Sequence, residues 1–183
     1  MELKTIAIVF ITSLAQAKAS AVVRNETEWF VIHERPIENG KLSYLGIPSI
    51  VPADWDWNSG WDTSEKWVAP QAINRRCGSN QIHCDGSNQA PSSVCQTLVN
   101  ILIKDPSAGV PSGITALTYS SGSFTCVVAW RGVISNMLQG YLSNAASLTL
   151  GNCGASGAVS GYATDVSLNN ACATQCLSNR AAC

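Results

Sequence analysis

The sequence predicts an α+β fold with a split βαβ (βαββαβ, ferredoxin-like) order, in which two helices cover one face of an antiparallel sheet. Three observations lead to this prediction. From Pro70 onward, apolar residues follow a strand period and a helix period in alternation. All eight cysteines lie in that same region, and the chain contains no internal repeat. A domain of about 110 residues buries one modest core, which disulfides commonly supplement.

The first strand and the first helix are expected before Pro106. Residues Ile73 to Asp85 form a candidate strand with an interruption at Gly78-Ser79-Asn80. Pro91 lies where a helix starts, because the first turn does not need the N–H that proline lacks. Pro106 ends this helix, whose apolar face consists of Val94, Cys95, Leu98, Ile101 and Leu102.

A hairpin follows the first helix. Its strands are predicted at Ile114–Tyr119 and Phe124–Trp130, joined by a Ser/Gly-rich loop. The second strand alternates with period two, which is typical of a half-buried strand. Its apolar face consists of Phe124, Cys126, Val128 and Trp130.

The last elements are a helix at about Val133 to Leu148 and a strand at about Val159 to Leu168. We expect the tail from Cys172 to Cys183 to be held by disulfides and to lack regular structure. The helix is predicted to turn Ile134, Met137, Leu138, Tyr141, Ala145 and Leu148 inward, and the strand to place Tyr162, Val166 and Leu168 on one face.

The N-terminal part predicts secretion. Lys4, a short apolar run and the small residues before Ala17 and Ala19 are typical of a signal peptide that is cleaved after one of these alanines. The predicted organisation is a signal peptide at 1–19, an N-terminal arm at 20–52 and a cysteine-rich domain at 53–183. The arm carries a glycosylation sequon at Asn25 and one short strand at Trp29–Ile32. No later segment reaches the roughly 20 apolar residues of a membrane span, so together with the signal peptide the sequence predicts a secreted, extracellular protein. We also expect it to be a monomer.

The cysteines predict a disulfide framework. An even number in a secreted chain indicates four bridges, although eight cysteines allow about 105 pairings and the sequence does not choose among them. Zinc is the rejected alternative, because Cys172 and Cys176 lack the CxxC spacing and the histidines are only His33 and His83. We expect no metal and no cofactor. The cysteines are Cys77, Cys84, Cys95, Cys126, Cys153, Cys172, Cys176 and Cys183.

Charge excludes a nucleic-acid partner. The formal net charge is −1, and no basic cluster stands out. Residues 20–69 carry four basic and eight acidic side chains, whereas residues from 70 onward carry five basic and three acidic ones. These net charges of −4 and +2 favour attraction between residues 20–69 and the cysteine region that follows them.

The sequence predicts no catalytic residue, and therefore not an enzyme. A G-x-S-x-G turn is absent, and His83 with Asp85 two residues away is more simply a histidine beside a disulfide than a general base. Asp54 and Asp56 have no visible cleft that would make them a glycosidase pair. Arg75-Arg76 is either a processing site or two exposed strand residues.

Four tryptophans occur in one acidic, turn-like segment, at Trp55, Trp57, Trp61 and Trp67. They are candidate binding residues if their indoles are exposed in one plane. They form a clamp if they are buried on the sheet, where each indole covers about 150–250 Å². A membrane contact is opposed by the neighbouring acids. We favour the clamp.

Spaced motifs give a family resemblance over about residues 53–183. The sequence resembles the secreted fungal WD-like domain family, which implies secretion and carries no assigned activity; the βαββαβ order is more remotely similar to killer toxins and necrosis-inducing-factor-like effectors. In this sequence Cys126 precedes Val127, where some relatives are expected to carry a second cysteine. The motifs are Trp55-Asp56, Lys66-Trp67-Val68-Ala69-Pro70, Arg76-Cys77-Gly78-Ser79-Asn80, Cys84-Asp85-Gly86-Ser87-Asn88, Gln139-Gly140-Tyr141-Leu142 and Thr174-Gln175-Cys176-Leu177-Ser178-Asn179-Arg180.

These observations predict a small secreted cysteine-rich protein that acts outside the cell by binding a protein or a glycan, in the manner of an effector or toxin. The alternatives are a carbohydrate-binding module that uses the tryptophans and a structural protein of the cell wall.

Overall fold

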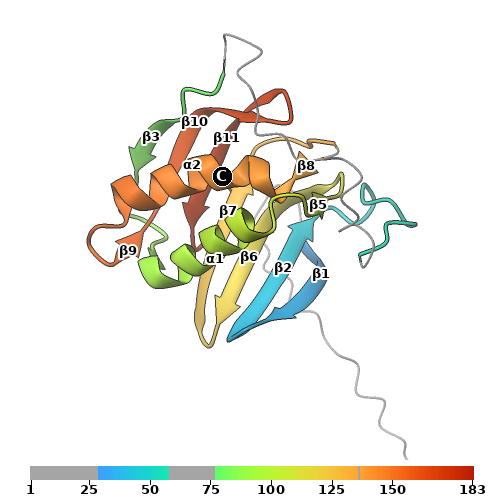
Figure 1. The fold of residues 1–183 in the computed structure, drawn as a ribbon, viewed down its shortest axis with the longest axis horizontal. Coiled ribbons are helices and arrows are strands. Elements are labelled where there is room, and N and C mark those ends of the chain that lie inside the picture. Colours follow the sequence, from blue (N-terminus) through green and yellow to red (C-terminus); the bar gives the residue numbers. More distant parts are fainter. Residues whose placement is uncertain (1–28, 58–76, 136) are drawn as a thin grey trace, which may run out of the picture.

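The computed structural model describes residues 29–57, 77–135 and 137–183 (Figure 1). In these residues an antiparallel sheet of seven strands carries two helices on one face. Short ladders pair β4 with β9 and β5 with β8. The elements are β1 (Phe30–Ile37), β2 (Gly40–Gly46), β3 (Gln81–Cys84), β4 (Ala90–Pro91), α1 (Ser92–Lys104), β5 (Gly109–Val110), β6 (Ile114–Ser121), β7 (Phe124–Trp130), β8 (Met137–Leu138), α2 (Gln139–Cys153), β9 (Ala158–Val159), β10 (Gly161–Leu168) and β11 (Ala171–Ser178).

The α+β class is confirmed, whereas the split βαβ strand order is not. The strands of the large sheet follow the order β1-β2-β6-β7-β11-β10-β3. Strand β11 lies between β7 and β10, so the expectation that the tail lacks regular structure was wrong. Its polar Gln175 is buried and donates from Nε2 to the Leu142 carbonyl oxygen at 2.8 Å. This bond explains how a loop-like composition fits inside a sheet.

The predicted arm contributes a hairpin rather than one short strand. Strands β1 and β2 are joined by Glu38 and Asn39, and Asn39 has a φ of 62°, which asparagine tolerates better than most residues. Strand β2 pairs with β6, so that Leu42 lies opposite Tyr119 and Tyr44 opposite Leu117. The hairpin is therefore part of the same sheet as the cysteine region.

Both predicted helices exist, but only α1 begins and ends where the sequence predicts. Helix α1 begins directly after Pro91 and ends before Asp105, as predicted. Helix α2 begins at Gln139 rather than Val133, because the two residues before it pair with β5 as strand β8. Leu148, predicted to face inward, is 40% exposed.

Strand β7 is buried on both faces. The hairpin β6–β7 is confirmed, and Cys126, Val128 and Trp130 lie in the core below the helices, although Phe124 is exposed. On the opposite face, Val127 and Ala129 form a second cluster with Ala116, against which Leu45, Ala181 and Cys183 pack.

Strand β10 departs from a simple alternation. A register shift between Ala163 and Val166 includes Asp165, which has a φ of 59°. This bulge places Ala163 in the core with Val166 and Leu168. Tyr162 is partly exposed and stacks on His83, its partner across the strands, with ring centroids 4.9 Å apart.

Four disulfides bind the C-terminal region together, and the prediction that all eight cysteines pair is confirmed. Helix α1 is joined to β7, β3 to the end of α2, and β11 both to the chain before β3 and to the C-terminus. None of them reaches the β1–β2 hairpin, because residues 29–57 contain no cysteine. None of the helices in the described ranges is long and apolar enough to cross a membrane. The bridges are Cys77–Cys172, Cys84–Cys153, Cys95–Cys126 and Cys176–Cys183.

Candidate functional site

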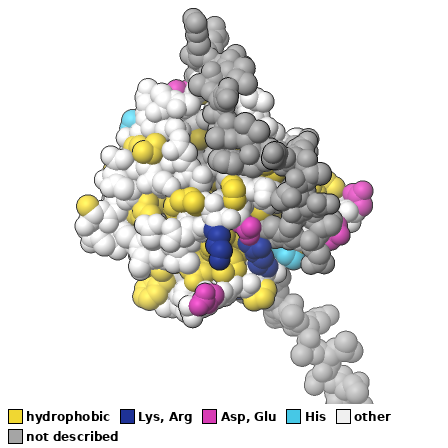
Figure 2. Space-filling view, in the orientation of Figure 1, with side chains coloured by type: hydrophobic (Ala, Val, Ile, Leu, Met, Phe, Trp, Pro, Cys, Tyr) yellow, Lys and Arg dark blue, Asp and Glu magenta, His cyan; other side chains and the backbone are white. Residues whose placement is uncertain are grey.

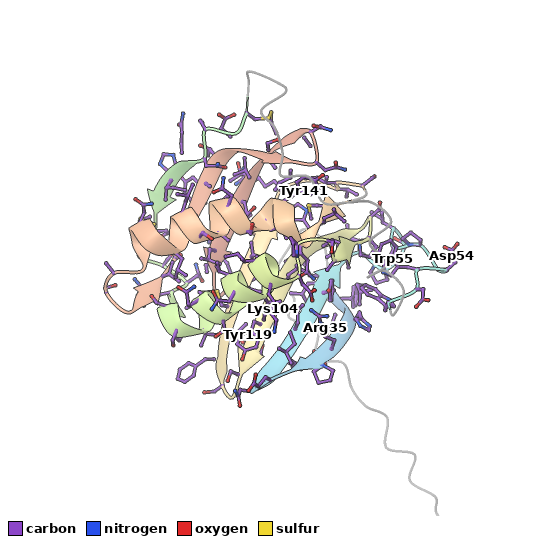
Figure 3. All side chains as sticks on the ribbon, in the orientation of Figure 1. Arg35, Asp54, Trp55, Lys104, Tyr119 and Tyr141 are labelled. Carbon is purple, nitrogen blue, oxygen red and sulfur yellow. A yellow bond between two sulfur atoms is a disulfide. The ribbon has the colours of Figure 1, made fainter. Side chains whose placement is uncertain are left out.

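A groove of about 490 Å³ runs along α1, where the turn of the β1–β2 hairpin and the end of β6 approach the helix. We call it the hairpin groove. Figure 3 labels two of its lining residues, Lys104 at the end of α1 and Tyr119 on β6. The lining consists of Ile37, Glu38 and Asn39 from the hairpin, Ser93, Val94, Thr97, Asn100, Ile101 and Lys104 from α1, and Tyr119 and Ser121 from β6.

The helix side of the groove is a polar stripe. Ser93, Thr97, Asn100 and Lys104 recur at intervals of three or four residues, so they share one face of α1. At about 1.5 Å of rise per residue, this stripe is about 17 Å long. It borders the buried apolar face that anchors α1 on the sheet, and the packing of that face fixes the position of the stripe.

The floor of the groove is apolar. Val94 and Tyr119 are only 8% and 3% exposed, and Ile37 and Ile101 are partly buried beside them. The Tyr119 hydroxyl donates to the Glu38 carbonyl oxygen at 3.4 Å. Gly40 permits the turn to approach this ring, because a Cβ there would lie 2.8 Å from the ring atom Cε2 of Tyr119.

Hydroxyl and amide groups form the rims. The Ser121 hydroxyl donates to the Asn39 carbonyl oxygen at 2.8 Å, which ties β6 to the hairpin turn. On α1 the Thr97 hydroxyl donates to the Ser93 carbonyl oxygen at 3.1 Å. The Asn100 side chain accepts through Oδ1 from Gln96 at 2.9 Å, and its own amide N–H groups have no hydrogen-bond acceptor among the described residues, so they can donate to a ligand. Each hydroxyl also keeps acceptor capacity.

The groove carries one charge of each sign. Lys104 lies at one end and Glu38 comes from the turn. Arg35 and Asp105 pair at 3.3 Å next to Lys104 and join β1 to the end of α1. Figure 2 shows basic and acidic side chains around a group of hydrophobic ones on this face of the molecule. The formal charges of the described lining residues therefore cancel.

Two of the four predicted binding tryptophans lie in the described residues, beside the hairpin. Trp57 packs partly buried against the core and stacks on His33, with ring centroids 4.2 Å apart and planes 9° apart. Its indole also meets the Tyr44 ring edge-on at 5.2 Å. Trp55 meets Trp57 edge-on at 6.2 Å and is partly exposed (Figure 3). Trp57 thus has the contacts of a clamp, whereas Trp55 keeps accessible indole surface.

Burial under this aromatic cluster changes two pKa values. Desolvation, and secondarily the Arg35 charge, lowers the pKa of His33 below its ordinary value. Desolvation raises the pKa of Tyr44 to about 12. Tyr44 is 1% exposed, and its hydroxyl oxygen accepts from the Gln139 amide at 2.8 Å. The cluster therefore holds neutral forms of both rings at ordinary pH.

Other residues singled out from the sequence lie apart from the groove. His83 is exposed on the edge strand β3. Hydrogen bonds to Asp85 from the Ser87 backbone N–H and hydroxyl lower its pKa, and Arg180 lies 3.9 Å away. Across the described residues, no group of three His, Cys, Asp or Glu side chains is arranged to hold a metal ion.

Further predictions fall outside the described residues and stay predictions. They concern the signal peptide, the glycosylation sequon at Asn25, the processing pair Arg75-Arg76, and the tryptophans Trp61 and Trp67.

The family comparison matches the part of the chain that carries the cysteines. The family model described as "Fungal WD-like" matches residues 61–183, about two thirds of the sequence. The chain belongs to the fungal WD-like family. Neither a curated protein nor a solved structure matches the chain. The WD-like match begins after the β1–β2 hairpin, so the groove combines family residues on α1 and β6 with residues from outside the match.

The sequence interpretation missed the hairpin side of the groove. A sufficient signal was present, because Asn39-Gly40 is flanked by Ile37, Leu42 and Tyr44. An Asn-Gly pair between alternating apolar residues is a strong hairpin signal. The prolines elsewhere in the arm led to the expectation of irregular structure.

Proposed function

We propose that this protein is secreted and acts outside the cell as a non-enzymatic, monomeric binding protein of the effector or toxin type. The predicted signal peptide and the four disulfides of a fungal family support secretion. The hairpin groove is the observation that supports binding.

The side chains that line the groove are better suited to binding a ligand than to catalysing a reaction on it. Its described lining contains hydroxyls, amides, one lysine and one glutamate around an apolar floor. A general base needs an orienting partner and a reacting atom within hydrogen-bond reach. Placed polar groups around an apolar surface instead fix the orientation of a ligand.

A blocking substitution tests this function. Thr97→Trp places an indole over the groove, on a partly exposed helix position. We expect the natural-sequence protein, applied to plant leaf tissue and to competing microbes, to cause a response in at least one of them, and Thr97→Trp to reduce it at least tenfold. Ile103→Trp is the matched control, since Ile103 is 55% exposed on the same helix but outside this groove. No response on either target would contradict the effector reading and favour a structural wall protein.

A second candidate function is carbohydrate binding through the tryptophan segment. The partly exposed indole of Trp55, supported edge-on by Trp57, is the observation that favours it. On a glycan array, loss of binding in Trp55→Ala with retention in Thr97→Trp would establish this second function.

A further inference from the structure

We infer that the ligand of the hairpin groove is a linear oligosaccharide of neutral sugars, held with its ring faces on the partly exposed side chains of Ile37 and Ile101 and with its hydroxyls on the two rims. This inference rests on the proposed binding function and names the chemistry of its ligand. This groove is a separate site from the tryptophan segment, because Trp55 and Trp57 are not among its lining residues.

Charge excludes strongly ionic ligands. A phosphate or polyanionic ligand needs several cations, whereas Lys104 is the only basic side chain among the described lining residues and is opposed by Glu38. The neighbouring Arg35 is paired with Asp105 at 3.3 Å, which further reduces the positive field. A polycationic ligand would need several acidic side chains, whereas the described lining holds only Glu38, opposed by Lys104. The charges of the groove therefore favour a neutral ligand.

The polar rims argue against an apolar ligand. Pockets for lipids and other apolar molecules enclose most of the ligand and are lined mainly by hydrophobic side chains. Here the apolar residues are confined to the floor, and both long sides carry short polar groups. The ligand must therefore offer hydrogen-bonding groups along two edges and apolar surface between them.

The residue types also argue against a protein partner. Binding energy at protein interfaces is concentrated in exposed tryptophan, tyrosine and arginine, with serine and threonine under-represented. Among the described residues that line the groove there is no tryptophan or arginine, and the one tyrosine there, Tyr119, is 3% exposed. Serine, threonine and asparagine supply the rims instead.

A chain of neutral sugars has the matching chemistry. A pyranose ring presents C–H groups on its faces and hydroxyls, which both donate and accept, around its edge. The free amide N–H groups of Asn100 and the ammonium of Lys104 donate to such hydroxyls, and the hydroxyl oxygens of Ser93, Thr97 and Ser121 accept from them. The stripe on α1 is about 17 Å long, so the groove has room for a linear ligand of more than one ring.

The test is titration of the ¹⁵N-labelled full chain with short linear oligosaccharides from chitin, β-glucan and mannan. We expect saturable shifts of backbone amides at Asn39, Thr97 and Asn100 with at least one of the three. Asn100→Ala should weaken that binding about three- to tenfold, since it removes hydrogen bonds worth about 0.5–1.5 kcal/mol each.

Two variants locate the site. Thr97→Trp should abolish the binding, and Ile103→Trp, which adds the same side chain to the other groove of α1, should leave the affinity within twofold. Binding that survives Thr97→Trp and disappears in Trp55→Ala would overturn the inference in favour of the tryptophan segment. Binding to none of the three oligosaccharides would also overturn it, whereas the proposed function would stand if the tissue response still depended on Thr97.

Discussion

The β1–β2 hairpin and the cysteine region share one sheet but are held in different ways. Residues 77–183 are cross-linked by four disulfides, two of which join a helix to a strand. The hairpin has none, and it depends on pairing with β6, on Leu42 and Tyr44 in the core, and on the Arg35–Asp105 pair. The cross-linked region therefore does not form the whole of the candidate site, because the hairpin forms one side of the groove.

The largest expected effect concerns the cross-linked region. Replacing Cys77 and Cys172 by alanine opens a bridge that spans 95 residues, and in the chain-entropy model this costs about 4–5 kcal/mol of unfolding free energy. Urea unfolding measures the loss. The matched control is the Cys176–Cys183 pair, which spans seven residues and should cost about 2–3 kcal/mol. Equal losses would show that loop length does not determine the contribution of these bridges.

The next prediction concerns packing of the hairpin. Leu42→Ala removes a side chain that is 0% exposed and should destabilise the protein by about 2–5 kcal/mol in urea. Leu45→Ala, at a partly buried position on the other face of the same strand, should cost less. A cost for Leu42→Ala below that of Leu45→Ala would contradict the view that packing under the helices holds the hairpin.

A smaller effect is expected from one hydrogen bond. Tyr44→Phe leaves the buried Gln139 amide without its acceptor, which should cost about 1–3 kcal/mol. Tyr141→Phe is the control, because Tyr141 is partly exposed and its hydroxyl makes no hydrogen bond among the described residues (Figure 3). Similar thermal unfolding midpoints for both variants would mean that the Tyr44–Gln139 bond does not fix the hairpin to α2.

The smallest predicted effect is a pH dependence from His33. Its pKa is lowered in the folded state, so the unfolded chain binds the proton first as the pH falls. The contribution to stability is therefore present above the ordinary histidine pKa of about 6.5 and is lost as the pH falls from there through the folded pKa. His33→Phe, which keeps an aromatic ring for Trp57, should flatten the unfolding free energy between about pH 7 and pH 5. If the unfolding free energy of this variant depends on pH as steeply as that of the natural-sequence protein, the assignment of the pH dependence to His33 is wrong.

The sequence predicted the features of the fold that depend on neighbouring residues, and it did not predict those that depend on distant segments. Local signals were sufficient for α1 and for the β6–β7 hairpin, because Pro91, Pro106 and the period-two pattern of β7 act within a few residues. The number of disulfides followed from the even count. Their pairing did not, because it depends on which segments become neighbours in space.

The strand order was beyond local patterns. Strand β11 contains Gln175 between short residues, and its burial depends on an acceptor in α2 that lies 33 residues away in the sequence. Likewise, Met137 continues the helical spacing of α2, yet its backbone pairs with β5. Non-local partners decided both cases, and a single sequence does not reveal them.

The candidate site was predicted least well. The tryptophans were predicted as candidate binding residues because four of them occur in one segment. Of these, Trp57 packs beside Tyr44. The groove instead uses ordinary serine, threonine and asparagine residues, which become a site only when α1 and the hairpin meet. The Asn39-Gly40 turn was the one signal in the sequence that pointed to this meeting.

Native-state amide hydrogen exchange tests the comparison between the two regions most directly. If the hairpin is held by non-covalent contacts without a disulfide, the amides of Leu42 and Tyr44 in β2 should exchange through a partial opening, at a lower free energy than those of Val128 in β7 and Cys176 in β11. The same opening free energy in all four strand positions would contradict the account, because the hairpin and the cross-linked region would then unfold as one unit.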